Sequence, residues 1–456
     1  MLADRLRTLL TVGLASLSLA AQDDPNVRTA TWPGGALRER YGVDEQGAKH
    51  GACEQWAENG TRTLLETWQH GERNGVRKVW TEAGQLRESQ TFLHGVLNGP
   101  SETFHADGSQ ASSGSFRAGQ RTGRWTDVDE GGARRRTSEY RDGLLHGPRK
   151  VLAGAKTLSR QVWKQGELVE LDGLAPFPVP RRTLHEQLLA ILSTAPTPDP
   201  ADGKSLLRQT ALLRLRAYRQ LCGLPQAEMV LNAPWNELCD AAAELNQAIG
   251  HLDHTPPRPA GFDEARYKQG YEGASHSNLA WGGSLPSAVD NWMDDSDPGN
   301  LDRIGHRRWC LNPAMKKTAF GTAGTYHAMW SMDASGAWPK GLDVVCYPPR
   351  GYVPVDLFGP RHAFSLAMRG GAPKTDDLRV AIRPLDADFV AGEPLELDAQ
   401  HVAAGGFGAG ACLVFRAKAL QVAVDRSYLV EVSTDAGKTT AWRYVVAFCE
   451  PVLGDR

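Results

Sequence analysis

The sequence lacks the features that would assign it at once to a common functional class. Its 456 residues carry a formal net charge of −2, so no overall basic field indicates a nucleic-acid partner. No G-x-S-x-G, H-E-x-x-H or P-loop motif occurs, and no G-x-G-x-x-G precedes an expected helix. These absences leave no residue that the sequence assigns with assurance to catalysis.

Long apolar runs are missing beyond the N-terminus. There, Arg5 and Arg7 precede an apolar run from Thr8 to Ala20, and small residues lead to a polar start at Gln22. This pattern is typical of a secretory signal peptide and is too short to span a bilayer. We therefore expect a signal peptide at residues 1–21, a mature chain without a transmembrane segment, and a periplasmic or extracellular location.

The seven cysteines form no C-x-x-C pair, which disfavours a structural zinc knuckle. In an oxidising compartment some of them can form disulfides. We favour a Cys412–Cys449 pair, because both residues lie on strand-like runs of one module. Buried free thiols are the alternative.

A period of 24 residues organises the first third of the chain. Glycines recur at two positions of each unit and aromatic residues at two more, and the columns are Gly47/71/95/119/143, Gly51/75/99/123/147, Trp68/Phe92/Phe116/Tyr140 and Trp56/Trp80/Phe104. Because Gly adopts positive φ at little cost, fixed Gly columns predict fixed turns between short strands. Stacked hairpins are expected to bury the aromatic columns as a ladder.

This grid resembles the MORN repeat of bacterial exported proteins. The resemblance implies a single-layer β-hairpin array over residues 22–170, which serves as a binding or scaffolding surface for protein or lipid partners. Histidines precede turn glycines at His50, His70, His94 and His146. Asn74 and Asn98 fill equivalent positions, so we interpret these histidines as turn residues rather than metal ligands.

Proline-rich stretches mark residues 171–204 as a linker, within which "TLHEQLLAILS" predicts one short helix. Helical periodicity begins at Ser205. A first helix is expected to end at Gly223, a second to run from Pro234 to Gly250, and a third to begin at the N-cap Ser284.

Several motifs in this region resemble the CAP superfamily, which includes cysteine-rich secretory proteins, antigen 5 and pathogenesis-related proteins. They are "RLRAYRQLCGLP", "HLDHT", "SHSNLAWG" and "AVDNWMDD … GHRRWCLNP … AFGT". The resemblance implies an α-β-α sandwich over residues 205–348.

By position, His254 and His306 match the two histidines of the CAP cleft. Two imidazoles with a carboxylate would suit a divalent metal such as zinc, or general acid–base chemistry. Ser277 replaces the Glu of the family pattern, and Ser is a poor ligand. Glu272 and His276 are the nearby candidates to substitute for it, and Asp294 and Asp295 lie near the position of the second acid. Both histidines can instead serve only as hydrogen-bonding residues of the cleft wall.

The last segment, residues 349–456, contains short alternating runs such as "LRVAIRPL" and "WRYVVAF" between Gly, Asp and Pro turns. These runs predict a small antiparallel β-sandwich. The expected fold is therefore multi-domain: a β-hairpin array, then an α-β-α sandwich, then a β-sandwich.

The sequence favours an exported, non-catalytic binding or scaffolding protein that engages lipid, glycan or protein ligands of the cell envelope. A metal-dependent hydrolase of envelope polymer or peptide, acting through His254 and His306, is the alternative. A purely structural envelope component is the third hypothesis.

Overall fold

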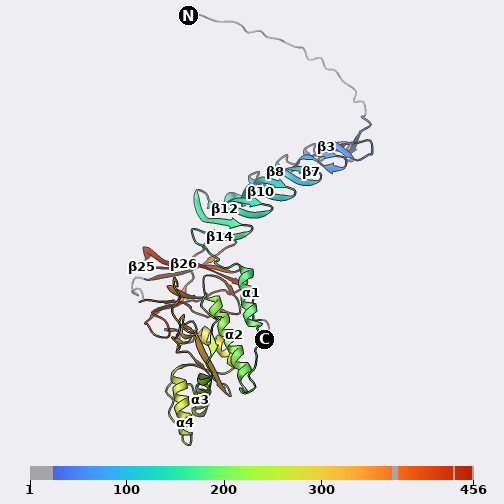
Figure 1. Cartoon of the computed structure of the whole chain (residues 1–456). Helices are drawn as coiled ribbons and strands as arrows, with labels where there is room; N and C mark the ends of the chain where they lie inside the picture. The colour runs from blue at the N-terminus through green and yellow to red at the C-terminus, as the bar shows by residue number, and fades with distance from the viewer. Residues whose placement is uncertain (1–23, 372–377, 435–436, 454–456) are drawn as a thin grey trace, which may run out of the picture. The chain divides into compact units, whose positions relative to one another are not determined.

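The computed structural model describes residues 24–371, 378–434 and 437–453, and the expected signal peptide lies outside them. Strands make up 42% of the described residues and helices 18%, so the fold is mostly β. The described residues form two compact units, unit 1 up to Gly147 and unit 2 from Pro148 onward (Figure 1).

Unit 1 is a series of antiparallel strands that pair almost entirely in chain order. The strands are β1 (Val27–Thr31), β2 (Leu37–Val43), β3 (Lys49–Trp56), β4 (Arg62–Gln69), β5 (Glu72–Arg73), β6 (Gly75–Trp80), β7 (Leu86–Leu93), β8 (Val96–Phe104), β9 (Gln110–Arg117), β10 (Gln120–Val128) and β11 (Arg135–Arg141). The short β5 pairs only with β4, and a 3₁₀ turn (Glu130–Gly132) precedes β11. The predicted hairpin array is thus confirmed as a long antiparallel sheet.

The register explains the 24-residue period. The Gly of one column lies opposite the aromatic residue of the next strand, as in Gly51–Trp68, Gly75–Phe92, Gly99–Phe116 and Gly123–Tyr140. At Gly75, φ is 122° and an added Cβ would lie 3.0 Å from Thr67 Cβ. Close strand approach therefore requires Gly there.

The tight turns of the array use two successive residues with positive φ. In the pair His70–Gly71 the φ angles are 47° and 81°, and in His94–Gly95 they are 48° and 78°. Hairpins favour such turns because their twist matches that of the strands. His70 and His94 lie at turn positions, as the sequence predicted. His50 and His146 do not: His50 lies in β3, and His146 lies in the strand Leu144–Ala153.

The aromatic columns are half-buried, contrary to the expected buried ladder; in unit 1, Trp125 is fully buried. The reason is that one sheet has no second layer to cover them. Cations cover part of the rings instead: Arg73 lies 5.0 Å from the ring centroid of Trp68. Beneath them, the buried Glu66 accepts from Arg73 Nε at 3.0 Å.

Strands β12 (Leu144–Ala153), β13 (Lys156–Lys164) and β14 (Glu167–Leu171) bring the long sheet to 14 strands. Unit 2 then adds six helices to the described part of the chain. They are α1 (Arg181–Leu192), α2 (Ser205–Leu221), α3 (Ala233–Ile249), α4 (Glu264–Ser275), α5 (Leu285–Asp294) and α6 (Gly305–Cys310).

The ends of these helices follow local capping chemistry. Asn232 accepts from Trp235 N at the start of α3, and Gly250 ends that helix with φ 77°. Ser284 accepts from Ser287 N in a capping box at α5. The helices expected in the linker, before Gly223, before Gly250 and after Ser284 are confirmed. Helix α4, capped by Asp263, was not predicted.

A four-stranded sheet lies among these helices in the order β15-β17-β18-β16, with bounds Val230–Leu231, Lys317–Ala323, Tyr326–Trp330 and Ser277–Trp281. Its alternate residues enter two different hydrophobic clusters. Ala319 and Ala328 pack with Cys239 and Ala242 of α3. The neighbouring Phe320 belongs to the main core, as do apolar residues of α2 and α5.

The remaining strands form two four-stranded sheets, β19-β21-β24-β23 and β20-β26-β25-β22. Their bounds are β19 (Val344–Tyr347), β20 (Gly351–Pro354), β21 (Phe364–Met368), β22 (Arg379–Leu385), β23 (Leu397–Ala403), β24 (Cys412–Ala417), β25 (Ser427–Thr434) and β26 (Thr439–Cys449). The β20–β26 pair is parallel, so the second sheet is not purely antiparallel as expected.

One hydrophobic core joins these sheets to the helices. It includes Leu188 of α1, Tyr218 of α2, Phe364 of β21 and Phe448 of β26. The linker helix and the last strands therefore belong to the same packed body as the helical segment, because each buries its apolar face on the others.

All seven cysteines are free thiols, and six of them are buried. The expected Cys412–Cys449 disulfide is wrong: the two residues lie on β24 and β26, in different sheets. The alternative of buried thiols holds. Among the described residues, no helix has both the length and the apolar character needed to cross a membrane.

Candidate functional site

The two histidines singled out by the sequence lie close together in unit 2. The ring centroids of His254 and His306 are 6.5 Å apart, with the ring planes 32° from parallel. His254 follows α3, and His306 lies in the first turn of α6. These elements therefore bring together two side chains that are 52 positions apart in the sequence.

Each imidazole is oriented by a hydrogen bond at Nδ1. His306 Nδ1 lies 2.8 Å from Oδ1 of Asp295, whose side chain is buried. His254 Nδ1 lies 3.0 Å from the carbonyl oxygen of Ala274. With Nδ1–H donating in both rings, each Nε2 keeps its lone pair. Asp295, one of the two acids noted in the sequence, is thus the orienting partner of His306.

The other three candidate residues do not join this pair. Glu272 is exposed on α4, and its carbonyl oxygen accepts from His276 Nδ1 at 2.9 Å. The His276 ring stacks on Trp330 at 4.8 Å. Ser277 is buried on β16 with Oγ 3.7 Å from Cys239 Sγ, so it packs against α3.

The donor set at His254 and His306 falls short of a zinc site. Zinc sites in proteins use at least three side-chain ligands. Among the described residues, the one cluster of three or more metal-ligating side chains lies elsewhere, in unit 1. The pair offers two imidazole nitrogens and no carboxylate ligand, so the residues present do not fit a resident zinc ion.

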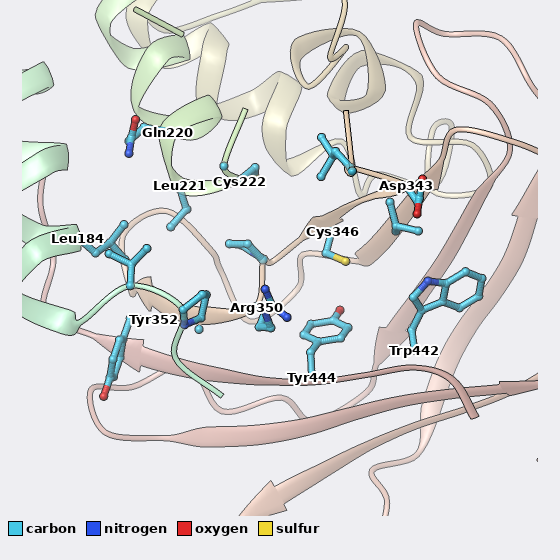
Figure 2. A pocket seen from close by; sticks show the side chains of 18 of the residues that line it. Leu184, Gln220, Leu221, Cys222, Asp343, Cys346, Arg350, Tyr352, Trp442 and Tyr444 are labelled. Carbon is cyan, nitrogen blue, oxygen red and sulfur yellow. The ribbon is translucent and has the colours of Figure 1, made fainter. Parts of the chain in front are cut away.

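A pocket of about 560 Å³ lies elsewhere in unit 2, and the sequence did not reveal it. Helices α1 and α2 contribute Leu184 and Leu221, β19 and β20 contribute Cys346 and Tyr352, and β26 contributes Trp442 and Tyr444 (Figure 2). These elements come from widely separated segments of the sequence. No local motif could therefore have shown that they meet.

Burial keeps two thiols and a phenol on the walls of this pocket neutral. It raises the pKa of the Cys346 thiol to about 12 and that of the Cys222 thiol further. It also raises the pKa of Tyr444 well above its ordinary value. The phenol oxygen of Tyr444 is buried without a hydrogen-bond partner among the described residues.

Two arginines line the pocket: Arg443, whose Nε lies 3.1 Å from Glu431 Oε1, and Arg350. Arg350 lies in the middle of the lining residues in Figure 2, between Leu221 and Cys222 on one side and Tyr444 on the other. Its side chain is exposed and forms no ion pair with a carboxylate of the described residues. Asp343 is the acidic residue of the lining. The pocket thus combines apolar walls with a guanidinium that is available to an anion.

No protein-family model matches the chain, and no curated protein matches its sequence.

Proposed function

We propose that the chain is an exported, non-catalytic binding protein whose pocket takes a small molecule with an apolar body and an anionic end. The observation that supports this proposal is the pocket of about 560 Å³ with largely apolar walls and Arg350 in its lining. Ligand sites are typically concave, largely apolar and furnished with a few polar groups that fix the orientation of the ligand.

The pocket offers apolar surface to the hydrocarbon body of such a ligand and a positive charge to its anionic end. Leu184, Leu221 and Trp442 offer apolar surface to a hydrocarbon body. Arg350 offers a planar fork of donors that matches a carboxylate or phosphate. The thiols and the phenol keep their protons at neutral pH, so these groups do not repel an anion, and Asp343 is the one acidic residue of the described lining.

Dodecanoate is a suitable probe, because it has a single hydrocarbon chain and one carboxylate. We expect it to bind the full-length protein and to change the fluorescence of Trp442. Arg350→Ala should weaken dodecanoate binding about 10-fold or more, since a charge-assisted contact is worth about 1.5–3 kcal/mol. Dodecanol, which lacks the charge, should bind wild type and Arg350→Ala equally.

Arg361→Ala is the matched control, because Arg361 is also an exposed arginine of unit 2 but does not line the pocket. It should bind dodecanoate like the wild type. Equal dodecanoate affinities for wild type and Arg350→Ala would contradict the proposal. Failure of any apolar anion to bind would leave a purely structural role.

We also propose that two segments of the chain adopt the folds that their sequence motifs resemble. Residues 205–348 would form a CAP-like α-β-α domain, supported by the two clusters that pack on alternate residues of β17 and by the approach of His254 to His306. Residues 22–170 would form a MORN-like array, supported by the Gly–aromatic register. Its half-buried aromatic residues and exposed cations would provide a second surface, for protein, lipid or glycan partners.

A hydrolase acting through His254 and His306 remains the second candidate; the pair does not fit a resident zinc ion, but one specific observation favours general acid–base chemistry there. His306 is held by the buried carboxylate of Asp295, an arrangement that also orients general bases. In this scheme His254 and His306 would act on envelope polymer or peptide.

The binding account predicts no hydrolysis of cell-wall fragments or peptides above background, with or without added zinc. Hydrolysis that His254→Ala and His306→Ala both abolish would instead support the hydrolase. His251→Ala is the control, because this exposed imidazole lies near His254 in sequence but bonds to the backbone of Ile249.

A further inference from the structure

The first 24-residue repeat of the hairpin array in unit 1 brings together two imidazoles and a carboxylate. Asp44, His50 and His70 each place a ligating atom within 4.8 Å of the other two. The His70 Nδ1 and Asp44 Oδ2 atoms are 3.0 Å apart, and the rings of His50 and His70 have centroids 5.0 Å apart. The three residues come from two turns and strand β3.

The backbone fixes two of these side chains in place. Asp44 Oδ1 accepts from Ala48 N at 2.9 Å and from Gln46 N at 3.1 Å, which leaves Oδ2 toward His70. His70 adopts φ 47° in its turn, which fixes the direction of its Cα–Cβ bond, and the contact of its Nδ1 with Asp44 Oδ2 orients the ring. Little ordering is then required when an ion binds.

We propose that Asp44, His50 and His70 form a binding site for a late first-row divalent cation such as Zn²⁺. Two atoms that each lie 2.0 Å from a tetrahedral ion are separated by about 3.3 Å. The observed 3.0 Å between Nδ1 and Oδ2 is close to that separation, so an ion would replace the shared proton with a small adjustment. Imidazole with carboxylate is a ligand set that suits zinc, copper and nickel.

Three protein ligands leave a fourth position for water or for a donor from another molecule. His70 and His50 are exposed, so that position faces solvent. The site lies in unit 1 and is independent of the pocket in unit 2.

The next 24-residue repeat of the array provides an internal comparison. His94 has the same turn conformation as His70, with φ 48°, and its Nδ1 lies 3.6 Å from Glu72 Oε2. The position equivalent to His50 is Asn74 there. That repeat has one imidazole instead of two, so we expect it not to bind the cation.

The test is a zinc titration of the full-length protein by calorimetry, with Co²⁺ absorption as a second readout of ligand geometry. The background carries His254→Ala and His306→Ala, so that the other imidazole pair cannot contribute. We expect one Zn²⁺ per chain. His50→Asn and His70→Asn should each weaken binding about 10-fold to 100-fold, in line with the loss of one nitrogen ligand.

Asn is chosen because it tolerates positive φ and because Asn74 naturally occupies the position equivalent to His50. Both variants should therefore fold, which circular dichroism checks. His94→Asn is the control and should bind zinc like its parent. Absence of zinc binding, or equal affinity in His70→Asn and its parent, would overturn the proposal and leave a His70–Asp44 ion pair only.

Discussion

His362 shows how burial sets the charge of a single side chain near the candidate site. Its Nε2 lies 3.4 Å from Asp294 Oδ1, beside the Asp295 that orients His306. Burial lowers the pKa of His362 to about 4, although Asp294 acts in the opposite direction. The imidazole is therefore neutral in the folded protein at neutral pH.

This pKa makes the stability of the protein depend on pH. The unfolded chain protonates His362 near pH 6.5, whereas the folded chain does so only near pH 4. Between these values the unfolded state binds more protons, so the free energy of unfolding should fall as pH is lowered from 6.5 to 4, by up to about 3 kcal/mol. Denaturant unfolding at several pH values measures this change.

His362→Gln should reduce that pH dependence, since glutamine does not titrate. His251→Gln serves as the control, because His251 is exposed, and it should leave the pH dependence unchanged. If His362→Gln and the wild type lost stability in parallel over this range, the assignment to His362 would be wrong.

Single residues of the candidate site were partly visible in the sequence. The motif positions of His254 and His306 indicated a common cleft, and the rings lie 6.5 Å apart. The sequence could not show that Ser277 packs against Cys239 or that His362 faces Asp294, because such contacts depend on side-chain direction. Spacing along a chain carries no information on that direction for distant residues.

Glycine columns made the hairpins the most predictable elements. A Gly with positive φ is needed at the turns, and the register at Gly75 further excludes a side chain. Helix α4 was harder to predict, because its buried residues are small. An added Cβ at Gly273 would lie 2.0 Å from the carbonyl oxygen of Leu238, so α4 approaches α3 through a glycine rather than through a stripe of large apolar residues.

Alanine substitutions at two glycines of the array distinguish the cost of backbone strain from the cost of a steric clash. Gly60 has φ 83° and open space around its Cβ position, so Gly60→Ala should cost only the strain, about 1 kcal/mol. Gly75 has φ 122° and Thr67 in contact, so Gly75→Ala should cost roughly 2–3 kcal/mol. Urea unfolding followed by circular dichroism compares them. Equal costs would show that the close approach of Thr67 is not what requires Gly75.

Unit 2 as a whole, rather than any one segment, builds the pocket. Its lining draws on α1 and α2 near residues 184 and 221, on the turn before β20, and on β26 beyond residue 440. The sequence placed α1 in a linker and β26 in a separate sandwich. The shared core of unit 2 is what brings these segments together, and it follows from long-range packing rather than from local patterns.

The central claim is that this pocket binds a ligand with an apolar body and an anionic end. Calorimetric titration of the full-length protein with dodecanoate tests it most directly, because it gives stoichiometry and affinity together. The account predicts one dodecanoate per chain, with affinity reduced about 10-fold or more in Arg350→Ala and unchanged in Arg361→Ala. No heat of binding, or the same affinity in both variants, would contradict it.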